Sequence, residues 1–424
     1  MTAIYVIALI LCAICGAPLF IILGGLALVL FATVGIDSQA VIIEMYRLAS
    51  APTLIAIPLF TFAGYLLAES KSPERLVNLY RVIFGWIPGG LAIVSFIACA
   101  FFTSFNGASG VTIIALGGLL YPLLTKERYT ERFSMGLITT SGSLGLLFPP
   151  SLPLILYAVV AQVNVDSLFL AGIIPGTLLI LLLSLFSVRA GLRSKVVRQP
   201  FHFKAIWPAL REAFWILPLP FIILVGIYGG IFTASEAAAV TVVYVLFVEL
   251  AIYRDLKITK DIPRIAAQSM VLVGSILVIL GCALGLTNYL VDEQVPMKII
   301  EMMRTFITNK WVFLAILNVF LLIVGCLMDI FSATIVVVPL IVPIAKEFGV
   351  NPLHLGIVFL TNLEIGYIHP PMGLNLFISS IRFKRPIMEI CITVLPFLAV
   401  LLAALIIITY VPWLSTWLPS LFRP

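Results

Sequence analysis

Long apolar segments separated by short polar stretches run along almost the entire chain. About 20 apolar residues cross the hydrocarbon core of a bilayer as a helix, and most of these segments approach or exceed that length. The pattern therefore predicts an all-α polytopic membrane protein. The apolar spans lie near residues 3–34, 48–68, 134–160, 168–188, 214–232, 235–252, 265–290, 355–381 and 387–412.

Two further apolar segments are interrupted in their middle. As unbroken helices, residues 86–120 and 311–345 would each be about 50 Å long, well beyond a hydrocarbon core of about 30 Å. The interruptions are TSFNGASG at 103–110 and the stretch from Gly325 through GCLMDIFS to Ser332. Free backbone is not tolerated in lipid, so these polar, glycine-containing breaks favour two re-entrant hairpins over pairs of ordinary short spans.

A charged amphipathic stretch precedes each hairpin. These stretches are SPERLVNLYRVIF at 72–84 and VPMKIIEMMRTFI at 295–307. Their pattern predicts helices that lie along the membrane surface. Because they occupy matching positions ahead of both hairpins, we expect them to brace the fold and not merely to connect its spans.

A proline pair follows a glycine at two places in the sequence, in SGSLGLLFPPS and in NLEIGYIHPPMG. Proline interrupts a membrane helix, so the two motifs predict two discontinuous helices. The motifs are 221 residues apart, and the same offset relates other prolines and threonines, which indicates a degenerate internal repeat. The matched pairs are Gly145 and Gly366, Pro149 and Pro370, Pro150 and Pro371, Pro122 and Pro343, Thr140 and Thr361, and Pro175 and Pro396.

A re-entrant hairpin returns to the side of the membrane from which it enters. On this basis five crossings separate Pro122 from Pro343, and an odd number of crossings inverts the second repeat relative to the first. The basic loops then fall on one face, which the positive-inside rule makes cytoplasmic. Residues 161–167 and 292–294 face outward, and the topology before residue 48 stays open between one tilted helix and two passes.

The predicted units are scaffold helices at 1–70, a surface arm helix at 71–85, the first transport repeat at 86–160, scaffold helices at 161–293, a second arm at 294–309, the second transport repeat at 310–381, and a C-terminal scaffold helix at 382–424.

Composition strengthens the membrane assignment. Hydrophobic residues make up 62% of the 424 residues, charged residues make up 10%, and the mean hydropathy is +1.20. The net charge of +6 comes from residues in short loops, which form no basic stripe for a nucleic acid. The six cysteines lie in apolar stretches without a partnering His, Asp or Glu cluster, which predicts small buried residues and no redox or metal site.

Breaks in paired helices expose the groups that an ion-coupled transporter needs. A half-helix that ends at Gly145 or Gly366 leaves carbonyl oxygens free, and these suit a hard cation such as Na⁺. The half-helix that restarts after each proline pair presents free amides, which favour a carboxylate. The predicted Na⁺ ligands, mostly main-chain carbonyls, are Asn106, Ala108, Gly145, Phe148 and Pro150 in the first repeat and Gly325, Gly366, His369 and Met372 in the second.

The second repeat carries two acidic residues that the first lacks. Asp329 and Glu364 stand where the offset places Ala108 and Ser143. Ionisable groups in a membrane core are usually functional, although Asp329 could instead anchor the hairpin and Glu364 could face an internal arginine or a water cavity. The predicted substrate residues are Asp329, Ser109, Ser332, Asn362, Glu364 and Asn375.

An intramembrane enzyme is disfavoured, because the three histidines (His202, His354 and His369) are scattered and form neither a metal cluster nor a nucleophile and base pair. No GxxxxGK phosphate loop is present, which disfavours a primary pump. The alternatives that stay open are a stand-alone sodium/carboxylate symporter and a membrane scaffold subunit that does not transport.

The chain resembles the large membrane subunit of tripartite ATP-independent periplasmic (TRAP) transporters over nearly its whole length. The resemblance rests on the two proline motifs and on IPLFTFAGYLL at 57–67, GGIFTASEAAAV at 229–240 and GCLMDIFSATIVVVPLIVPIA at 325–345. It implies sodium-coupled uptake of an organic acid across the bacterial inner membrane, an elevator motion, a small four-helix membrane subunit and a periplasmic substrate-binding protein. The sequence looks most similar to the sialic acid branch, with C4-dicarboxylates possible. His369 and the NGAS tip depart from the family pattern, which puts side-chain ligation there in doubt.

Overall fold

The computed structural model describes residues 17–35, 52–193, 203–294 and 309–422, with isolated positions between these ranges. Over these ranges the chain forms helices and loops and no β-strand. The elements are α2 (Leu19–Val34), η1 (Pro52–Ile55), α4 (Ala56–Glu69), α5 (Ser72–Phe84), α6 (Gly90–Asn106), α7 (Ser109–Lys126), α8 (Glu131–Ser141), η2 (Leu144–Leu147), α9 (Leu152–Ala161), α10 (Val165–Arg193), α11 (Phe203–Ala213), α12 (Pro218–Tyr228), α13 (Ala234–Phe247), the π-helix η3 (Val248–Ile252), α14 (Asp261–Asp292), α16 (Lys310–Leu327), α17 (Ile330–Glu347), α18 (Pro352–Gly366), α19 (Leu374–Phe383), α20 (Ile387–Tyr410) and α21 (Trp413–Leu421).

The described helices confirm a multi-pass membrane protein. Seven of them are long and apolar enough to cross a bilayer, and the number rises to nine if two bent helix pairs each count as one span. One of these pairs, α8 with η2 followed by α9, bends by 45° at the first proline pair. The longest helix, α14, has 32 residues and is about 48 Å long, so it must tilt to stay within a bilayer.

The internal repeat is confirmed element by element. A shift of 221 residues, the separation of Ser143 from Glu364, superimposes the bounds of α7 (Ser109–Lys126) on those of α17 (Ile330–Glu347). The same shift relates α6 to α16, α8 to α18 and α9 to α19 within a few residues. Each repeat therefore consists of a helix, a two-residue break and a second helix, followed by a helix broken at a proline pair. The peptide bond within each proline pair is cis.

The two repeats exchange partners. Helix α7 of the first repeat packs on α19 of the second, and α17 of the second packs on α9 of the first. Likewise α8 packs on α20, and α18 packs on α10. Contacts that are exchanged in this reciprocal way are what a pseudo-two-fold axis between the repeats produces.

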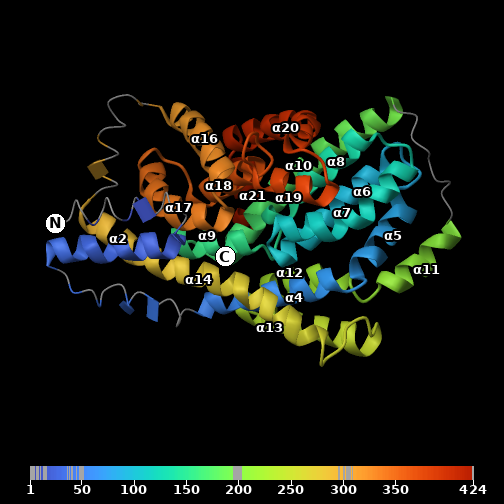
Figure 1. The fold of residues 1–424 in the computed structure, drawn as a ribbon, viewed down its shortest axis with the longest axis horizontal. Helices are drawn as coiled ribbons and strands as arrows, with labels where there is room; N and C mark the ends of the chain where they lie inside the picture. The colour runs from blue at the N-terminus through green and yellow to red at the C-terminus, as the bar shows by residue number, and fades with distance from the viewer. Residues whose placement is uncertain are drawn as a thin grey trace.

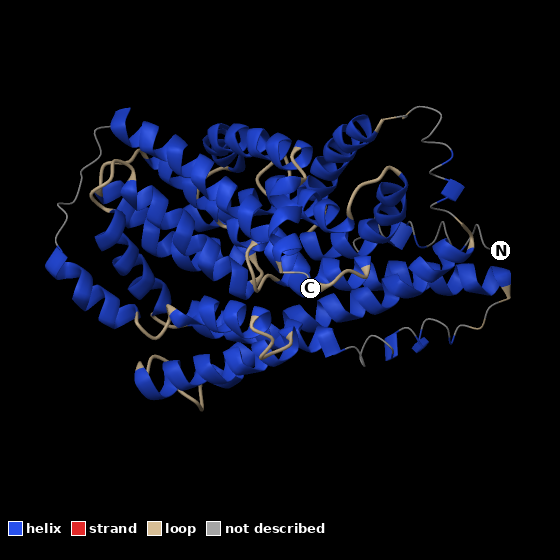
Figure 2. Ribbon diagram, turned by 180° about the vertical axis from the view of Figure 1, so that it is seen from behind, coloured by secondary structure: helices blue, strands red, loops and turns tan. Residues whose placement is uncertain are grey.

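A second group of helices lies along one side of this body. Figure 1 shows α2, α4, α13 and α14 running beneath the repeats, and Figure 2 shows the same layer from behind. Helix α4 is the centre of the layer, because it packs against α13 and α14 within the layer and against α6 of the first repeat. The repeats are therefore attached to the layer chiefly through the first hairpin.

Ion pairs join the loops that the sequence places on the cytoplasmic face. Arg75 pairs with Asp255, and three further pairs link Arg81 to Glu127, Arg264 to Glu69 and Arg385 to Glu131. Partial burial raises the pKa of Asp255, but hydrogen bonds from Arg75 and the Lys71 amide outweigh this effect and hold that pKa below its usual value. The basic loops therefore gather at one end of the molecule, as predicted.

The first surface helix lies where the sequence placed it, since α5 covers Ser72–Phe84. Most of the second, at 295–307, lies outside the described residues, as does most of the chain before residue 17. Two short helices were not anticipated: α11, which packs on α5, and the C-terminal α21, which packs on α10. The prediction that the cysteines are buried is confirmed for Cys99, Cys282 and Cys391 and is wrong for Cys12, which is exposed, and for Cys326, which is partly exposed. An apolar stretch of a membrane protein need not be covered by other protein segments.

Candidate functional site

The tip of the first hairpin is built by its own side chains. Helix α6 ends at Asn106, and Gly107 reverses the chain in a left-handed conformation, with φ of 65°. The Asn106 side chain accepts a hydrogen bond from the Ala108 amide at 2.8 Å and donates one to Thr112 Oγ1 at 3.1 Å. The Asn106 side chain therefore shapes the tip, and its backbone nitrogen packs beside Gly64 of α4.

The tip of the second hairpin is closed by an acidic cap. Asp329 is the N-cap of α17, and its Oδ2 accepts hydrogen bonds from the amides of Phe331 and Ser332, each at 3.0 Å. The Tyr367 hydroxyl, from the second break, accepts a hydrogen bond from the Ile330 amide at 2.7 Å. Asp329 is an exposed side chain, so it both orders the tip and presents negative charge at the molecular surface.

Glycines let each broken helix touch the hairpin of its own repeat. A Cβ at Gly145 would overlap the Ala100 carbonyl oxygen and lie 2.5 Å from the Ser104 amide nitrogen. A Cβ at Gly366 would lie 2.5 Å from the carbonyl carbon of Gly325. In the repeat, Gly325 is the equivalent of Ser104. Both breaks are therefore packed against hairpin backbone at corresponding points of the two repeats.

The carbonyl groups at the breaks differ in their availability. The prediction that the carbonyls of Gly145 and Gly366 are unpaired is wrong, because each accepts a hydrogen bond at 3.0 Å, from Phe148 and His369 respectively. The cause is that the chain makes a tight turn directly after each helix end. A carbonyl oxygen has a second lone pair, so each can still face a cation.

Three of the other predicted carbonyl ligands carry no such bond. Among the described residues, the carbonyl oxygens of Phe148, Pro150 and Met372 accept no hydrogen bond. The His369 carbonyl accepts one from Gly373 at 3.1 Å, and the Ala108 carbonyl accepts one from Val111 at 3.1 Å. Free oxygens thus stand beside both proline pairs, and a hard cation such as Na⁺ prefers oxygen donors of this kind.

Two predicted substrate residues meet between the repeats. Ser109, at the first hairpin tip, donates a hydrogen bond to Asn375 Oδ1 at 2.7 Å, and Asn375 in turn donates to the Thr139 carbonyl at 3.2 Å. The Thr139 hydroxyl donates to Ser379 Oγ at 2.8 Å. All four residues are buried. Sequence reasoning missed Thr139 and Ser379, although the polar run TTSGS at 139–143, next to the first break, was a signal.

The remaining predicted substrate residues lie apart from that cluster. Asn362 donates to Asn318 Oδ1 at 2.7 Å, and from there a buried polar chain continues through Thr409 and His354 to Ser415. Ser332 lies in the first turn of α17 beside its Asp329 cap. Glu364 is fully buried, and neither of its carboxylate oxygens has a hydrogen-bond partner. The structure thus divides the six residues among four places: Ser109 with Asn375, Asp329 with Ser332, Asn362 in the polar chain, and Glu364 by itself.

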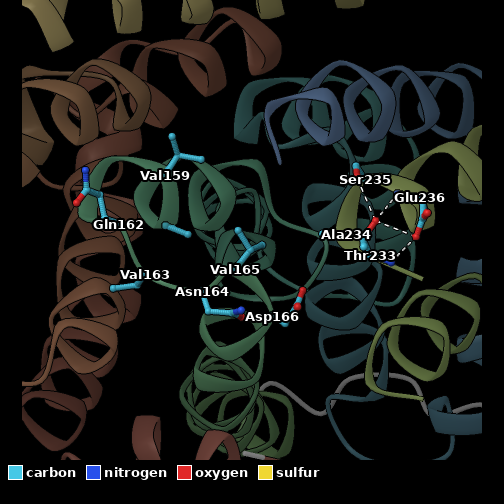
Figure 3. Close-up of a pocket in the computed structure, with 11 residues that line it drawn as sticks. Val159, Gln162, Val163, Asn164, Val165, Asp166, Thr233, Ala234, Ser235 and Glu236 are labelled. Atoms are coloured by element: carbon cyan, nitrogen blue, oxygen red, sulfur yellow. Dashed lines mark hydrogen bonds between the residues drawn. The ribbon is translucent and has the colours of Figure 1, made fainter. Parts of the chain in front are cut away.

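The pocket drawn in Figure 3 has a volume of about 650 Å³ and lies away from the breaks. It lies between the connection from α9 to α10 and the start of α13, where Glu236 completes the capping box of Thr233. None of the predicted site residues lines it. Its two carboxylates, Asp166 and Glu236, disfavour an anionic substrate, so the broken helices are the better candidate site.

Two inverted repeats that each place a broken helix against a hairpin tip define a class of membrane protein, the secondary transporters. Residues 4–414 match the family model described as "Tripartite ATP-independent periplasmic transporter, DctM component". The chain therefore belongs to the family of large permeases of TRAP transporters, which are multi-pass proteins of the bacterial inner membrane.

Named relatives and a solved structure agree with this assignment. The chain is 37% identical to the C4-dicarboxylate TRAP transporter large permease protein DctM of Vibrio cholerae, over 87% of this chain and 86% of the relative. It is 32% identical to the sialic acid TRAP transporter large permease protein SiaM of the same species, over 87% of each. The YdaH transporter of Alcanivorax borkumensis shares the fold, with a TM-score of 0.63, 15% identity and coverage of 91% of this chain and 89% of that one.

Proposed function

We propose that this permease imports an organic acid by sodium symport, together with a small membrane subunit and a periplasmic substrate-binding protein. The observation that carries the proposal is the pair of breaks, each of which combines free carbonyl oxygens with the start of a new helix. The carbonyls of Phe148, Pro150 and Met372 attract Na⁺, and the amide ends of α9 and α19 attract a carboxylate. Cation and anion then stabilise each other in one site.

The substrate is held where the second break meets both hairpin tips. Asn375 connects this break to Ser109 of the first hairpin, and Tyr367 connects it to Ile330 of the second. A carboxylate at the N-terminal end of α19 would lie close to these contacts. Na⁺ bound at the break neutralises the charge that the substrate brings into the membrane core, which is the physical basis of coupling.

The packing supports an elevator motion of the repeats against the layer formed by α2, α4, α13 and α14. Helices α10 and α20 pack on the broken helices α8 and α18. We therefore group α10 and α20 with the mobile part, although the sequence-based division placed residues 161–293 and 382–424 in the scaffold. The contact between α4 and α6 is the surface along which the two parts slide.

The substrate class rests on the relatives. Identity to the C4-dicarboxylate permease (37%) exceeds identity to the sialic acid permease (32%), so C4-dicarboxylates are the first compounds to test and sialic acid the second. Both carry a carboxylate, which is the group that the helix N-termini recognise.

Uptake into proteoliposomes tests the proposal. Vesicles that contain this chain and its small subunit are given radiolabelled succinate or sialic acid, with and without an inward Na⁺ gradient and the binding protein. We expect accumulation only when both are supplied. Uptake with Na⁺ alone would indicate a stand-alone symporter, and absence of uptake of every carboxylate offered would favour a scaffold subunit.

A further inference from the structure

Glu364 is the buried acid that the proposed transport site does not explain. Its side chain is fully buried in the last turn of α18, and both carboxylate oxygens lack a hydrogen-bond partner. Buried polar groups are almost always paired, so two unpaired oxygens on one carboxylate indicate a missing ligand. The ion pairs of the described residues involve Arg75, Arg81, Arg264 and Arg385, and none of them includes Glu364.

The position of Glu364 relative to the two repeats is specific. Its repeat equivalent is Ser143, whose hydroxyl contacts the Glu364 carbonyl oxygen at 3.4 Å. Equivalent residues that touch each other lie on the pseudo-two-fold axis. Thr140, three residues before Ser143 and therefore on the same side of the chain, has a buried hydroxyl without a partner. The Glu364 main chain thus touches the other repeat at the axis, and both Glu364 and Thr140 carry buried side-chain oxygens without a hydrogen-bond partner.

The surrounding backbone adds negative potential at the same point. Helix α8 ends at Ser141 and α18 ends at Gly366, so the C-terminal ends of two helices converge beside Glu364. Each helix end carries about half a negative charge from its last carbonyls. An ionised carboxylate in this setting is strongly destabilising without a neighbouring positive charge.

We propose that Glu364, with the hydroxyls of Thr140 and Ser143, binds one small monovalent cation on the axis between the repeats. Sodium is the cation in the function proposed above, on which this inference rests. The site differs from the main-chain sites at the breaks, because Gly366 packs on Gly325 of its own hairpin whereas the Glu364 main chain contacts Ser143 of the other repeat. Residues two positions apart point to nearly opposite sides of a helix.

The site also accounts for the difference between the repeats. A site on the axis is shared, so it needs only one carboxylate, and Ser143 supplies a hydroxyl from the position where a second acid would repel the first. The charge of the cation is then balanced by Glu364 alone. Because both repeats contact the ion, their relative position depends on whether the ion is bound.

The first test compares Na⁺ binding by the wild type and Glu364→Gln, which keeps the shape and removes the charge. Binding is followed by the rise in Tm of the purified protein with NaCl relative to choline chloride, and transport by the Na⁺ dependence of uptake in proteoliposomes. We expect Glu364→Gln to show a smaller rise in Tm and a lower Hill coefficient for Na⁺. Glu74→Gln, on the exposed face of α5, is the control and should match the wild type.

A second variant tests the geometry and protects against a simple folding defect. The double change Ser143→Glu with Glu364→Ser moves the carboxylate across the axis, and we expect it to recover Na⁺ responses that Glu364→Ser alone loses. Equal Na⁺ responses in the wild type and Glu364→Gln would overturn the inference and leave Glu364 as a neutral buried acid. A wild type whose Tm responds to Na⁺ while its uptake does not would instead refute sodium coupling and retain the cation site.

Discussion

The two proline breaks occupy equivalent places in the repeats but differ in their surroundings. At the first break Pro150 is buried and Ser151 has no exposed surface, whereas Pro371 is exposed and Met372, the equivalent of Ser151, is 54% exposed. The hairpin tips differ in the same sense, because Asn106 is fully buried and Asp329 is exposed. The first break is therefore covered by protein at Pro150 and Ser151, although a pocket of about 240 Å³ reaches Phe148 and Pro149, whereas the second break is open at the surface.

The difference teaches that the two repeats keep the same order of helices but differ in how far their breaks are buried. The first break is covered by α10, which packs on η2, and by α6. At the second break Met372 is 54% exposed, and of the two acidic residues of this repeat Asp329 is at the exposed hairpin tip and Glu364 is buried. An enclosed break suits a tightly held ion, and an open one suits a substrate that must enter and leave.

The largest effect is expected at Asp329, the charge that only the second hairpin tip carries. Asp329→Ala should lower uptake by at least about 100-fold, about 2.7 kcal/mol of lost transition-state stabilisation, without preventing membrane insertion. Uptake and membrane content of the variant are measured together. Asp329→Asn separates the two roles, since Asn caps a helix as well as Asp. Wild-type uptake by Asp329→Asn would show that Asp329 acts only as a cap.

Chemical labelling tests the contrast between the breaks directly. In a background with Cys12 and Cys326 replaced by alanine, since these are the described cysteines that are not buried, Met372→Cys should react with a polar thiol reagent at least about 30-fold faster than Ser151→Cys, because thiol reactivity follows exposure. Labelling of Met372→Cys should slow in the presence of Na⁺ and substrate. Equal rates at the two positions would remove the distinction between an open and an enclosed half.

The next largest effect, on the Na⁺ dependence of uptake, is expected at the matched glycines Gly145 and Gly366. Gly145→Ala and Gly366→Ala each introduce a Cβ against hairpin backbone, and the resulting shift of the nearby carbonyls should raise the half-saturating Na⁺ concentration about tenfold. Gly145→Ala should also lower Tm slightly more, since its Cβ would overlap the Ala100 carbonyl oxygen, whereas the nearest backbone atom to a Cβ at Gly366 is at 2.5 Å. Na⁺ titrations of uptake and melting curves measure both quantities. Unchanged Na⁺ dependence in both variants would count against Na⁺ ligation at the breaks.

The smallest effect concerns the hydrogen bond between the first hairpin and the second repeat. Ser109→Ala removes one neutral hydrogen bond to Asn375, worth about 1 kcal/mol, so uptake should fall about fivefold. The double variant with Asn375→Ala should lose less than the sum of the single losses if the two residues act as a pair. Additive losses would show that the residues contribute separately.

Much of the fold followed from local features of the sequence. The bounds of α5, the two hairpin breaks and both proline breaks were predicted, because proline, glycine and amphipathic periodicity act within a few residues. The helices α11 and α21 were missed, since each is short and follows a segment that had already been assigned. The candidate site was predicted only as a set of positions. Nothing in the sequence indicated that Ser109 meets Asn375 whereas Asn362 points into a different polar network.

The sequence by itself determined the membrane setting, the internal repeat and the family, because hydropathy and the 221-residue offset are properties of the chain alone. Tertiary structure decided which carbonyls stay free, which residues of the two repeats touch, and which break is enclosed. Those outcomes depend on packing between segments more than 200 residues apart, such as Ser109 with Asn375 and Ser143 with Glu364. The pattern along the chain marks each of these residues as a polar group near a break, but only the folded arrangement decides which of them are in contact.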